Sequence, residues 1–494
     1  MPINLSGQNV SIDKDLSINQ NTQPLTGSIR WGNTEDYYSF NFSSRSSLNL
    51  ALNDLYANLN VQVLDSNGQE VAGSYNRRNR DELISTTLEA GNYYIKVYRF
   101  RNAISDYTLR YSINSISQSP QSVGAFLPNA QSSPQNAGAW LDMVIQDVQL
   151  RDVVKSSFSD SVIDRNDVIK ILRASSDEGV VDATEFKDLK NLVSNASLLG
   201  IPEYVRVLTN KVVNGDPANQ RYQGNSLGNL SAGSSSAQIE NLVNKWFIGR
   251  DYPKTSYTYK EASGSLFQNG VSYKDIKQGQ INDCYFLAGL AATAFNSPNT
   301  IEKMFIDNGD NTYTVRFFRN QIADYVSVDK YLPTDYAGNF VYASKGTSYN
   351  NPGNELWVAL AEKAYAQLNE SGWIYQDNTN SYSGIGKGGY VSDALSQITG
   401  NQVSMSNVLN LNSILKAISS GESISLASKS TDVAPNVIAA HAYILVNYNS
   451  STQRFTLFSP WGIDVSLPKP GILEIGWSEI ESNFSYWDAT RKYT

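Results

Sequence analysis

Two residues of this sequence are the only ones of their type, and both have side chains that could take part in catalysis. The chain has one cysteine, Cys284, and one histidine, His441. A zinc site normally takes three or four ligands drawn mainly from these two residue types, so zinc chemistry is nearly excluded. A single cysteine closes no intramolecular disulfide, and catalysis by an imidazole has one candidate. The sequence therefore directs attention to a thiol that works with a histidine.

The surroundings of Cys284 favour a nucleophile. Cys284 follows Asp283, a typical helix N-cap residue, and precedes an apolar, alanine-rich run that predicts a helix. A thiol at a helix N-terminus lies at the positive end of the dipole, which favours the thiolate. Gln278, six residues upstream, has an amide that can join a backbone N–H in an oxyanion hole. A buried structural thiol is the commoner fate of a lone cysteine, but this context favours catalysis.

His441 lies in a segment with the pattern of a strand. Residues 439–446 alternate and continue through residues 447–453 into residues 454–458, which predicts a β-hairpin. A lone histidine is usually exposed or hydrogen-bonded without a catalytic role. Here it stands between two alanines in an apolar strand, and we expect it to act as the general base.

These segments resemble the calpain family of papain-like cysteine proteases. The family motif Gln-Gly-x-x-Gly-Asp-Cys-Trp is matched at Gln278, Gly279, Asp283 and Cys284, with Asn282 in place of the second Gly and Tyr285 in place of the Trp. Other segments similar to the family are Val328–Thr334, Glu355–Ala366 and His441-Ala442-Tyr443. The resemblance covers roughly residues 241–483.

The resemblance implies an α+β papain-like core with two lobes, with Cys284 on a helix of one lobe and His441 on a strand of the other. It implies that Gly388 and Gly389 lie against the substrate backbone, and that Gln278 stabilises the oxyanion. Calpains carry Asn-Pro-Trp-Gly after the hairpin, where this chain has Ser459-Pro460-Trp461-Gly462. Ser459 is the third catalytic residue on this reading. Because serine is shorter than asparagine, we expect it to orient the imidazole less well.

The implied function is that of a bacterial calpain-like cysteine endopeptidase that acts on proteins or peptides, itself included. The chemistry requires no cofactor. The family implies calcium as an activator, but the sequence identifies no metal ligands. One alternative is a weakened or inactive protein that serves as a binding scaffold, since Ser459 replaces the expected Asn. Another is a transglutaminase-like acyltransferase, against which the helix around Glu362-Lys363-Ala364-Tyr365 argues.

The N-terminal part of the chain has the alternation of β-strands. Apolar residues recur at every second position in segments such as residues 38–42, 48–52 and 93–97, and turn signals separate these segments. The pattern predicts an antiparallel β-sandwich over residues 1–116. Glu35–Phe40, Leu64–Gly68 and Leu88–Tyr94 resemble the bacterial pre-peptidase C-terminal domain. Such a domain is expected to be a stabilising or targeting appendage.

The remaining chain divides by composition. Residues 117–138 and 223–237, rich in Ser and Gly, predict linkers. Residues 139–222 predict a helical spacer, and residues 238–494 the protease core. The spacer contains an EF-hand-like loop in which Gly179, Asp182 and Glu185 occupy the sixth, ninth and twelfth positions. Ala174 occupies the first, where a carboxylate belongs. We therefore expect a helix–loop–helix without calcium.

Overall composition excludes several classes of partner. The 494 residues carry a net charge of -8 without long charged runs, which does not favour nucleic acid. The longest apolar stretches fall short of the roughly 20 residues of a membrane-spanning helix, so we expect none. No secretory signal is visible, which favours the cytoplasm, whereas the sandwich domain favours export by a leaderless route. The sequence carries no signal for an oligomeric state.

Overall fold

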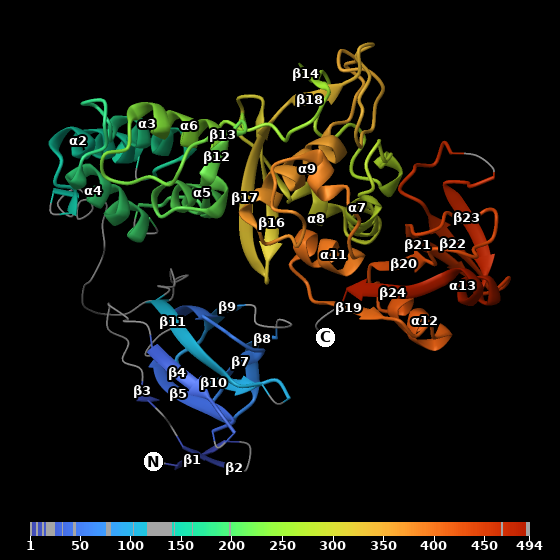
Figure 1. The fold of residues 1–494 in the computed structure, drawn as a ribbon, viewed down its shortest axis with the longest axis horizontal. Helices are drawn as coiled ribbons and strands as arrows, with labels where there is room; N and C mark the ends of the chain where they lie inside the picture. Colours follow the sequence, from blue (N-terminus) through green and yellow to red (C-terminus); the bar gives the residue numbers. More distant parts are fainter. Residues whose placement is uncertain are drawn as a thin grey trace, which may run out of the picture. The chain divides into compact units, whose positions relative to one another are not determined.

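The computed structural model describes residues 2–5, 8–11 and 14–15, residues 25–115 except 32, 43–45, 76–80 and 102, and residues 141–490 except 143, 161, 197–198 and 466–467. Its contacts divide the chain into two compact units, residues 1–129 with 320–322, and residues 130–319 with 323–494 (Figure 1). The expected linker 117–138 lies outside the described residues.

The first unit is built of strands. They are β1 (Pro2–Leu5), β2 (Gln8–Ser11), β3 (Lys14–Asp15), β4 (Leu25–Ile29), β5 (Glu35–Phe42), β6 (Ser46–Asn53), β7 (Leu59–Leu64), β8 (Glu70–Ser74), β9 (Glu82–Leu88), β10 (Gly91–Arg99) and β11 (Ser105–Ser115). One sheet has the order β3-β5-β10-β7-β8, and another β4-β11-β6-β9. All the pairings are antiparallel except that of β3 with β5, which is parallel. Alternate residues of both sheets enter one hydrophobic cluster, so the predicted strands are confirmed.

The second unit begins with helices. They are α2 (Val148–Ser157), α3 (Arg165–Ala174), α4 (Ala183–Ser194), α5 (Glu203–Val213) and α6 (Ser236–Trp246). The EF-hand-like loop lies between α3 and α4, and Gly179 in it has a left-handed φ of 88°. Glu185 accepts a hydrogen bond from the Asp182 backbone N–H at 2.7 Å and completes a capping box. Its carboxylate therefore caps a helix.

Residues 223–237, which were expected to be a linker, are bonded to the structure around them. Val181 donates to the Ser234 carbonyl at 2.7 Å, and the Gly233 N–H donates back to Val181 at 2.8 Å. Leu230 is buried. The composition resembles that of a linker, yet the backbone is held by hydrogen bonds.

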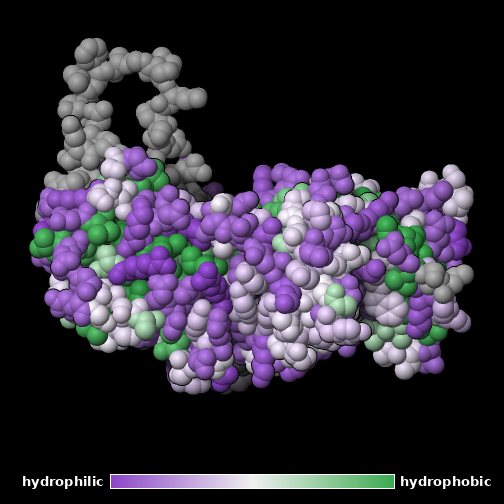
Figure 2. All heavy atoms as spheres, turned by 90° about the horizontal axis from the view of Figure 1, so that it is seen from above, coloured by the Kyte–Doolittle hydropathy of each residue, from purple (hydrophilic) through white to green (hydrophobic). Residues whose placement is uncertain are grey.

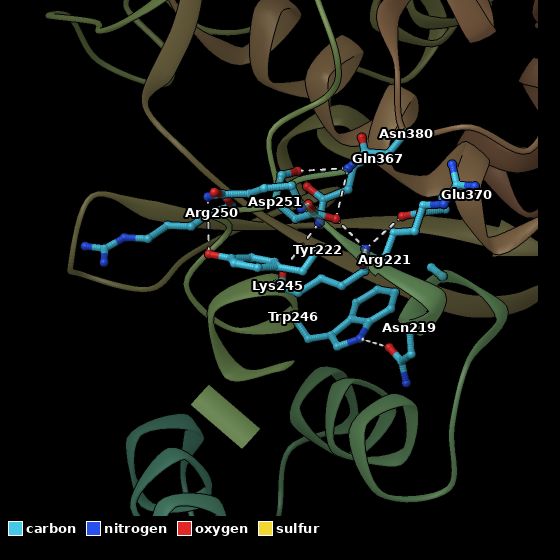
Figure 3. A network of polar contacts seen from close by, with 12 residues as sticks. Asn219, Arg221, Tyr222, Lys245, Trp246, Arg250, Asp251, Gln367, Glu370 and Asn380 are labelled. Atoms are coloured by element: carbon cyan, nitrogen blue, oxygen red, sulfur yellow. Dashed lines mark hydrogen bonds and ion pairs between the residues drawn. The ribbon is translucent and has the colours of Figure 1, made fainter. Parts of the chain in front are cut away.

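A buried lysine joins helix α6 to the following chain. The Lys245 ammonium pairs with Asp251 and, at 2.7 Å, with Glu370, and donates to the Arg221 carbonyl at 2.9 Å (Figure 3). The neighbouring Trp246 donates from its ring nitrogen to Asn219 at 2.6 Å. Because the ammonium is fully buried, these partners are required to keep its charge inside the protein.

The central part combines helices with small sheets. Its helices are α7 (Cys284–Asn296), α8 (Pro298–Glu302), α9 (Trp357–Leu368), α10 (Tyr382–Ile385) and α11 (Val391–Thr399). Its strands are β12 (Arg221–Tyr222), β13 (Asn225–Ser226), β14 (Thr258–Glu261), β15 (Phe305–Asp307), β16 (Thr312–Arg319), β17 (Ile322–Asp329) and β18 (Tyr331–Thr334). Every residue of α9 is buried, including Glu362 and Lys363.

The C-terminal part is a six-stranded sheet of order β19-β24-β20-β21-β22-β23 with two helices, drawn in orange and red in Figure 1. Its elements are β19 (Val403–Ser406), α12 (Leu411–Ser419), β20 (Ile424–Ser428), β21 (Ala442–Asn449), β22 (Arg454–Phe458), β23 (Ile472–Gly476), α13 (Trp477–Asn483) and β24 (Phe484–Thr490). The predicted hairpin is present as β21 and β22. The strand expected from residue 439 begins at Ala442 instead, because Ala440 has a left-handed φ of 48°.

Strand β21 lies between two cores. Ala442, Ile444 and Val446 belong to the hydrophobic cluster that contains α7, whereas Tyr443 and Leu445 belong to the cluster of the C-terminal sheet. This alternation follows from the period of two in a strand. It places the start of β21 against the helix that begins at Cys284.

No helix in the described part of the chain has both the length and the apolar character needed to cross a bilayer. On the face drawn in Figure 2, hydrophobic residues occur in separated groups among hydrophilic ones.

Candidate active site

Cys284 is the first residue of α7 and its side chain is partly exposed, whereas residues 285–294 are all buried. The backbone N–H of Ala442, the residue after His441, acts on the thiol and favours its ionised form. Burial raises the pKa of the thiol, and the charge of Asp283 raises it further, while the backbone N–H groups oppose both effects. The structure therefore brings the only cysteine to the residue beside the only histidine.

His441 directly precedes β21 and is 6% exposed. Its backbone N–H donates to the Ser428 hydroxyl at 2.9 Å, and its ring packs edge-on against Trp461 with centroids 5.5 Å apart. Burial lowers the pKa of His441 to about 4, and the nearby Lys469 charge acts in the same direction. The imidazole is therefore neutral at physiological pH.

Ser459 follows β22 and is fully buried. Its Oγ lies 3.0 Å from Nε2 of His441 and also accepts the Trp461 backbone N–H at 3.2 Å. The next residue, Pro460, accepts the backbone N–H of Gln278 at 2.8 Å. The segment that begins at Ser459 thus contacts both the imidazole and the chain leading to Cys284.

Gln278 lies in the loop before α7. Its Nε2 donates to the Ile281 carbonyl at 2.7 Å and to Oδ1 of Asp283 at 3.3 Å. Its two N–H groups therefore have partners inside the protein. Service in an oxyanion hole requires one of them to exchange its acceptor for the substrate oxygen.

Gly388 and Gly389 follow a residue that is bridged to the loop before Cys284. Lys387 forms a parallel β-bridge with Asn282, two residues before Cys284. Gly388 has a φ of 81°, and a Cβ on Gly389 would lie 2.8 Å from the ring of Tyr285. Only glycine therefore lets this backbone run so close to the residues that flank Cys284.

The N-cap position predicted for Asp283 is confirmed, but its side chain does not cap helix α7. The carboxyl is turned inward, where it meets Gln278 and the carboxyl of Glu362. The sequence analysis names Glu362 only as part of a helix and does not predict this contact. A charged residue within an apolar helix was the signal that was available.

Calcium was implied as an activator by the resemblance. Among the residues that the structure describes, no group of three or more His, Cys, Asp or Glu side chains is arranged to hold a metal ion. In the EF-hand-like loop, Glu185 is committed to capping α4. The residues present there do not fit a calcium ion.

Comparison with known proteins adds independent information. Residues 251–468 match the model of the calpain family cysteine protease, and residues 34–99 that of the bacterial pre-peptidase C-terminal domain. The chain is 33% identical over 162 residues to calpain-type cysteine protease DEK1 of Zea mays, which covers 32% of this chain and 7% of that protein. It is 26% identical over 255 residues to Calpain-13 of Rattus norvegicus, which covers 46% of this chain and 35% of that protein.

The Calpain-1 catalytic subunit of Rattus norvegicus is 28% identical over 253 residues, which cover 46% of this chain and 31% of that protein. The chain thus spans a third or so of the two rat proteins and under a tenth of the maize protein. In each case the similarity is partial. Residues 251–468 nevertheless match the calpain family of cysteine proteases, in a chain whose residues 34–99 match the bacterial pre-peptidase C-terminal domain.

Proposed function

We propose that the protein is a cysteine endopeptidase in which Cys284 is the nucleophile and His441 the general base. One observation carries the proposal. The thiol of Cys284 lies against the N–H of Ala442 while Nε2 of His441 faces Ser459 at 3.0 Å. With Nε2 engaged there, Nδ1 is the nitrogen that remains to take the thiol proton. On this proposal the helices around α7 and the sheet around β21 act as two lobes, and the substrate lies between them.

The reaction proceeds by acyl transfer. The thiol proton passes to Nδ1 of His441 as sulfur attacks the scissile carbonyl carbon. The backbone N–H of Cys284 and the Gln278 amide stabilise the oxyanion that forms. Nδ1 then gives its proton to the leaving amine, and a thioester remains on Cys284. The same nitrogen removes a proton from water as its oxygen attacks the thioester; the C–S bond then breaks, the acid leaves, and sulfur takes the proton back from Nδ1.

Burial keeps both partners neutral at rest, because it raises the pKa of the thiol and lowers that of the imidazole. The thiol proton is therefore expected to pass to His441 as sulfur attacks the carbonyl carbon, and not to form a thiolate–imidazolium pair before the substrate binds. The same observation supports a second candidate, a weakened or inactive protein that binds peptides without cleaving them. Protein or peptide substrates, self-processing and calcium activation complete the proposal. No step of the chemistry requires calcium.

Labelling of the single thiol tests this function. Purified protein is incubated with an epoxide-type thiol-protease inhibitor and, separately, with an internally quenched peptide library, each with calcium and with a chelator. We expect labelling at Cys284 and hydrolysis of peptides, both absent from Cys284→Ala. Inhibitor labelling without any hydrolysis would support the inactive binding protein. Equal rates with calcium and with chelator would remove calcium activation from the proposal.

A further inference from the structure

Two carboxyl groups are buried directly beneath the nucleophile. Asp283 precedes Cys284, and Glu362 lies on α9, and both are 0% exposed. The proposed reaction gives neither of them a chemical step. Two buried acids at one site are costly unless their charge is reduced and their oxygens are hydrogen-bonded. Their retention beside the reactive thiol therefore calls for a role.

The hydrogen bonds of the pair lead to the oxyanion hole. Glu362 accepts the backbone N–H of Ala343 at 3.0 Å on Oε2. Asp283 accepts the Gln278 amide at 3.3 Å on Oδ1. The remaining oxygens, Oδ2 of Asp283 and Oε1 of Glu362, are buried without a donor from any other group in the described structure. The two carboxyls interact with each other, and one proton shared between these two oxygens would give both of them a hydrogen bond.

The groups that face the pair are acids as well. Asp283 acts electrostatically on Cys284 and Tyr285 of α7 and on Tyr365 of α9. Glu362 acts on Tyr342 and on Tyr382 of α10. These neighbours are neutral near pH 7, since burial raises the pKa of each. The electrostatic partners of the pair thus supply no positive charge, which favours keeping the proton.

We propose that Asp283 and Glu362 share a proton and act as positioning residues that hold the Gln278 amide and the first turn of α7 for acyl transfer. This inference rests on the proposed cysteine-protease function. Glu362 is anchored by the Ala343 N–H, Asp283 is anchored by Glu362, and Gln278 is held by Asp283. Gln278 is also joined through its backbone to Pro460, next to the residue that contacts His441. The chain of contacts therefore links the oxyanion donor to the histidine side of the site.

The pair also has a pH-dependent effect on the thiol. Burial raises the pKa of Asp283 to about 7, whereas the hydrogen bond from Glu362 lowers it. Below that pH the pair holds two protons, and above it one proton, with the charge on Asp283. The anion disfavours the Cys284 thiolate. Loss of this charge is expected to make the thiol more acidic and faster to alkylate.

The first experiment separates positioning from packing. Asp283→Ala removes the acceptor for Gln278, whereas Asp283→Asn keeps an amide oxygen there and a donor toward Glu362. We expect Asp283→Ala to lower kcat about tenfold with KM changed less than about threefold, and Asp283→Asn to recover most of that loss. In a Gln278→Ala background, Asp283→Ala should lower kcat by no more than about twofold further. The proposal would be overturned if Asp283→Ala lowered kcat as much in the Gln278→Ala background as it does alone. It would also be overturned if Asp283→Asn, at the same Tm as Asp283→Ala, recovered none of the lost kcat.

The second experiment needs no substrate and no loss of packing. Because Cys284 is the only thiol, the rate of alkylation by iodoacetamide against pH reports on it alone. Asp283→Asn should alkylate severalfold faster than the unaltered protein at pH 8. In Glu362→Gln the amide always donates to Asp283. The change in alkylation rate that accompanies ionisation of Asp283 should therefore move from near pH 7 to lower pH. Failure of peptide hydrolysis would refute the protease proposal, whereas identical alkylation profiles in the three proteins would overturn the proton-sharing pair.

Discussion

Replacing Ser459 by asparagine should raise kcat more than it changes KM. The Ser459 hydroxyl lies 3.0 Å from Nε2 of His441 and can act either as donor or as acceptor. When it accepts from Nε2–H, Nδ1 is free to take the thiol proton. When it donates to Nε2, the ring proton stays on Nδ1 and blocks that transfer. An asparagine oxygen only accepts, so Ser459→Asn removes the unproductive tautomer.

The magnitude follows from two contributions. Removing one of two comparable tautomers is worth about twofold in rate. A fixed amide oxygen is expected to hold the ring, once it is charged, better than a rotating hydroxyl does, by roughly 1 kcal/mol or about fivefold. Together they give about tenfold, or ~1.4 kcal/mol. The larger side chain enters a fully buried position, which we expect to lower the stability by about 1–3 kcal/mol without changing substrate binding.

The assay is hydrolysis of an internally quenched peptide, with active sites counted by inhibitor titration. Ser459→Ala is the matched control, because it deletes Oγ and leaves both Nε2 and the Trp461 N–H without their partner. We expect it to lower kcat by about tenfold or more, with KM within about twofold. If Ser459→Asn fails to raise kcat and Ser459→Ala matches the unaltered protein, then this contact does not orient His441.

Three further outcomes follow from burial and charge. Lys245→Met should lower the unfolding free energy by about 3–5 kcal/mol, since it leaves Asp251 and Glu370 buried without a cation, whereas Lys155→Met, at a solvent-exposed pair, should change it by under about 1 kcal/mol. Chemical denaturation measures both. His441 has a folded pKa of about 4 against an ordinary value near 6.5. Its contribution to the unfolding free energy is therefore complete above pH 6.5 and is lost as pH falls toward 4. The loss should be about 3 kcal/mol relative to His441→Gln. Self-cleavage, read by mass spectrometry, should fall within residues 117–138 and spare residues 223–237, whose backbone is hydrogen-bonded to α4's N-terminal loop; cuts that persist in Cys284→Ala would contradict self-cleavage.

Much of the architecture could be read from periodicity. The alternation at residues 38–42 and 48–52 predicts strands because side chains of a strand point to opposite faces, and the structure buries those residues. The hairpin after His441 was predicted for the same reason. Single copies of cysteine and histidine directed attention to Cys284, whose thiol the structure brings to the backbone N–H of Ala442, and to His441, the residue before Ala442.

Other features depend on tertiary contacts that no local pattern encodes. Asp283 has the residue type of a cap, yet its side chain is drawn away by Gln278 and Glu362, which lie elsewhere in the sequence. The Ser- and Gly-rich composition at 223–237 predicts a linker, but a loop from α3 to α4 supplies its hydrogen-bond partners. The left-handed φ of Ala440, which ends the run before β21, has no sequence signal in alanine.

Burial and the Asp283 charge oppose early ionisation of Cys284 more strongly than the nearby backbone N–H groups favour it. Burial and the Asp283 charge raise the pKa of the thiol, while burial and the Lys469 charge lower that of His441. A standing thiolate would react with electrophiles and oxidants whether or not a substrate is bound. A neutral pair becomes nucleophilic only when the proton can pass to His441 as the new bond forms. The geometry of His441 and Gln278, rather than a prior charge separation, would then set the rate. This is why substitutions at Ser459 and Asp283, which hold those two side chains, are expected to act mainly on kcat.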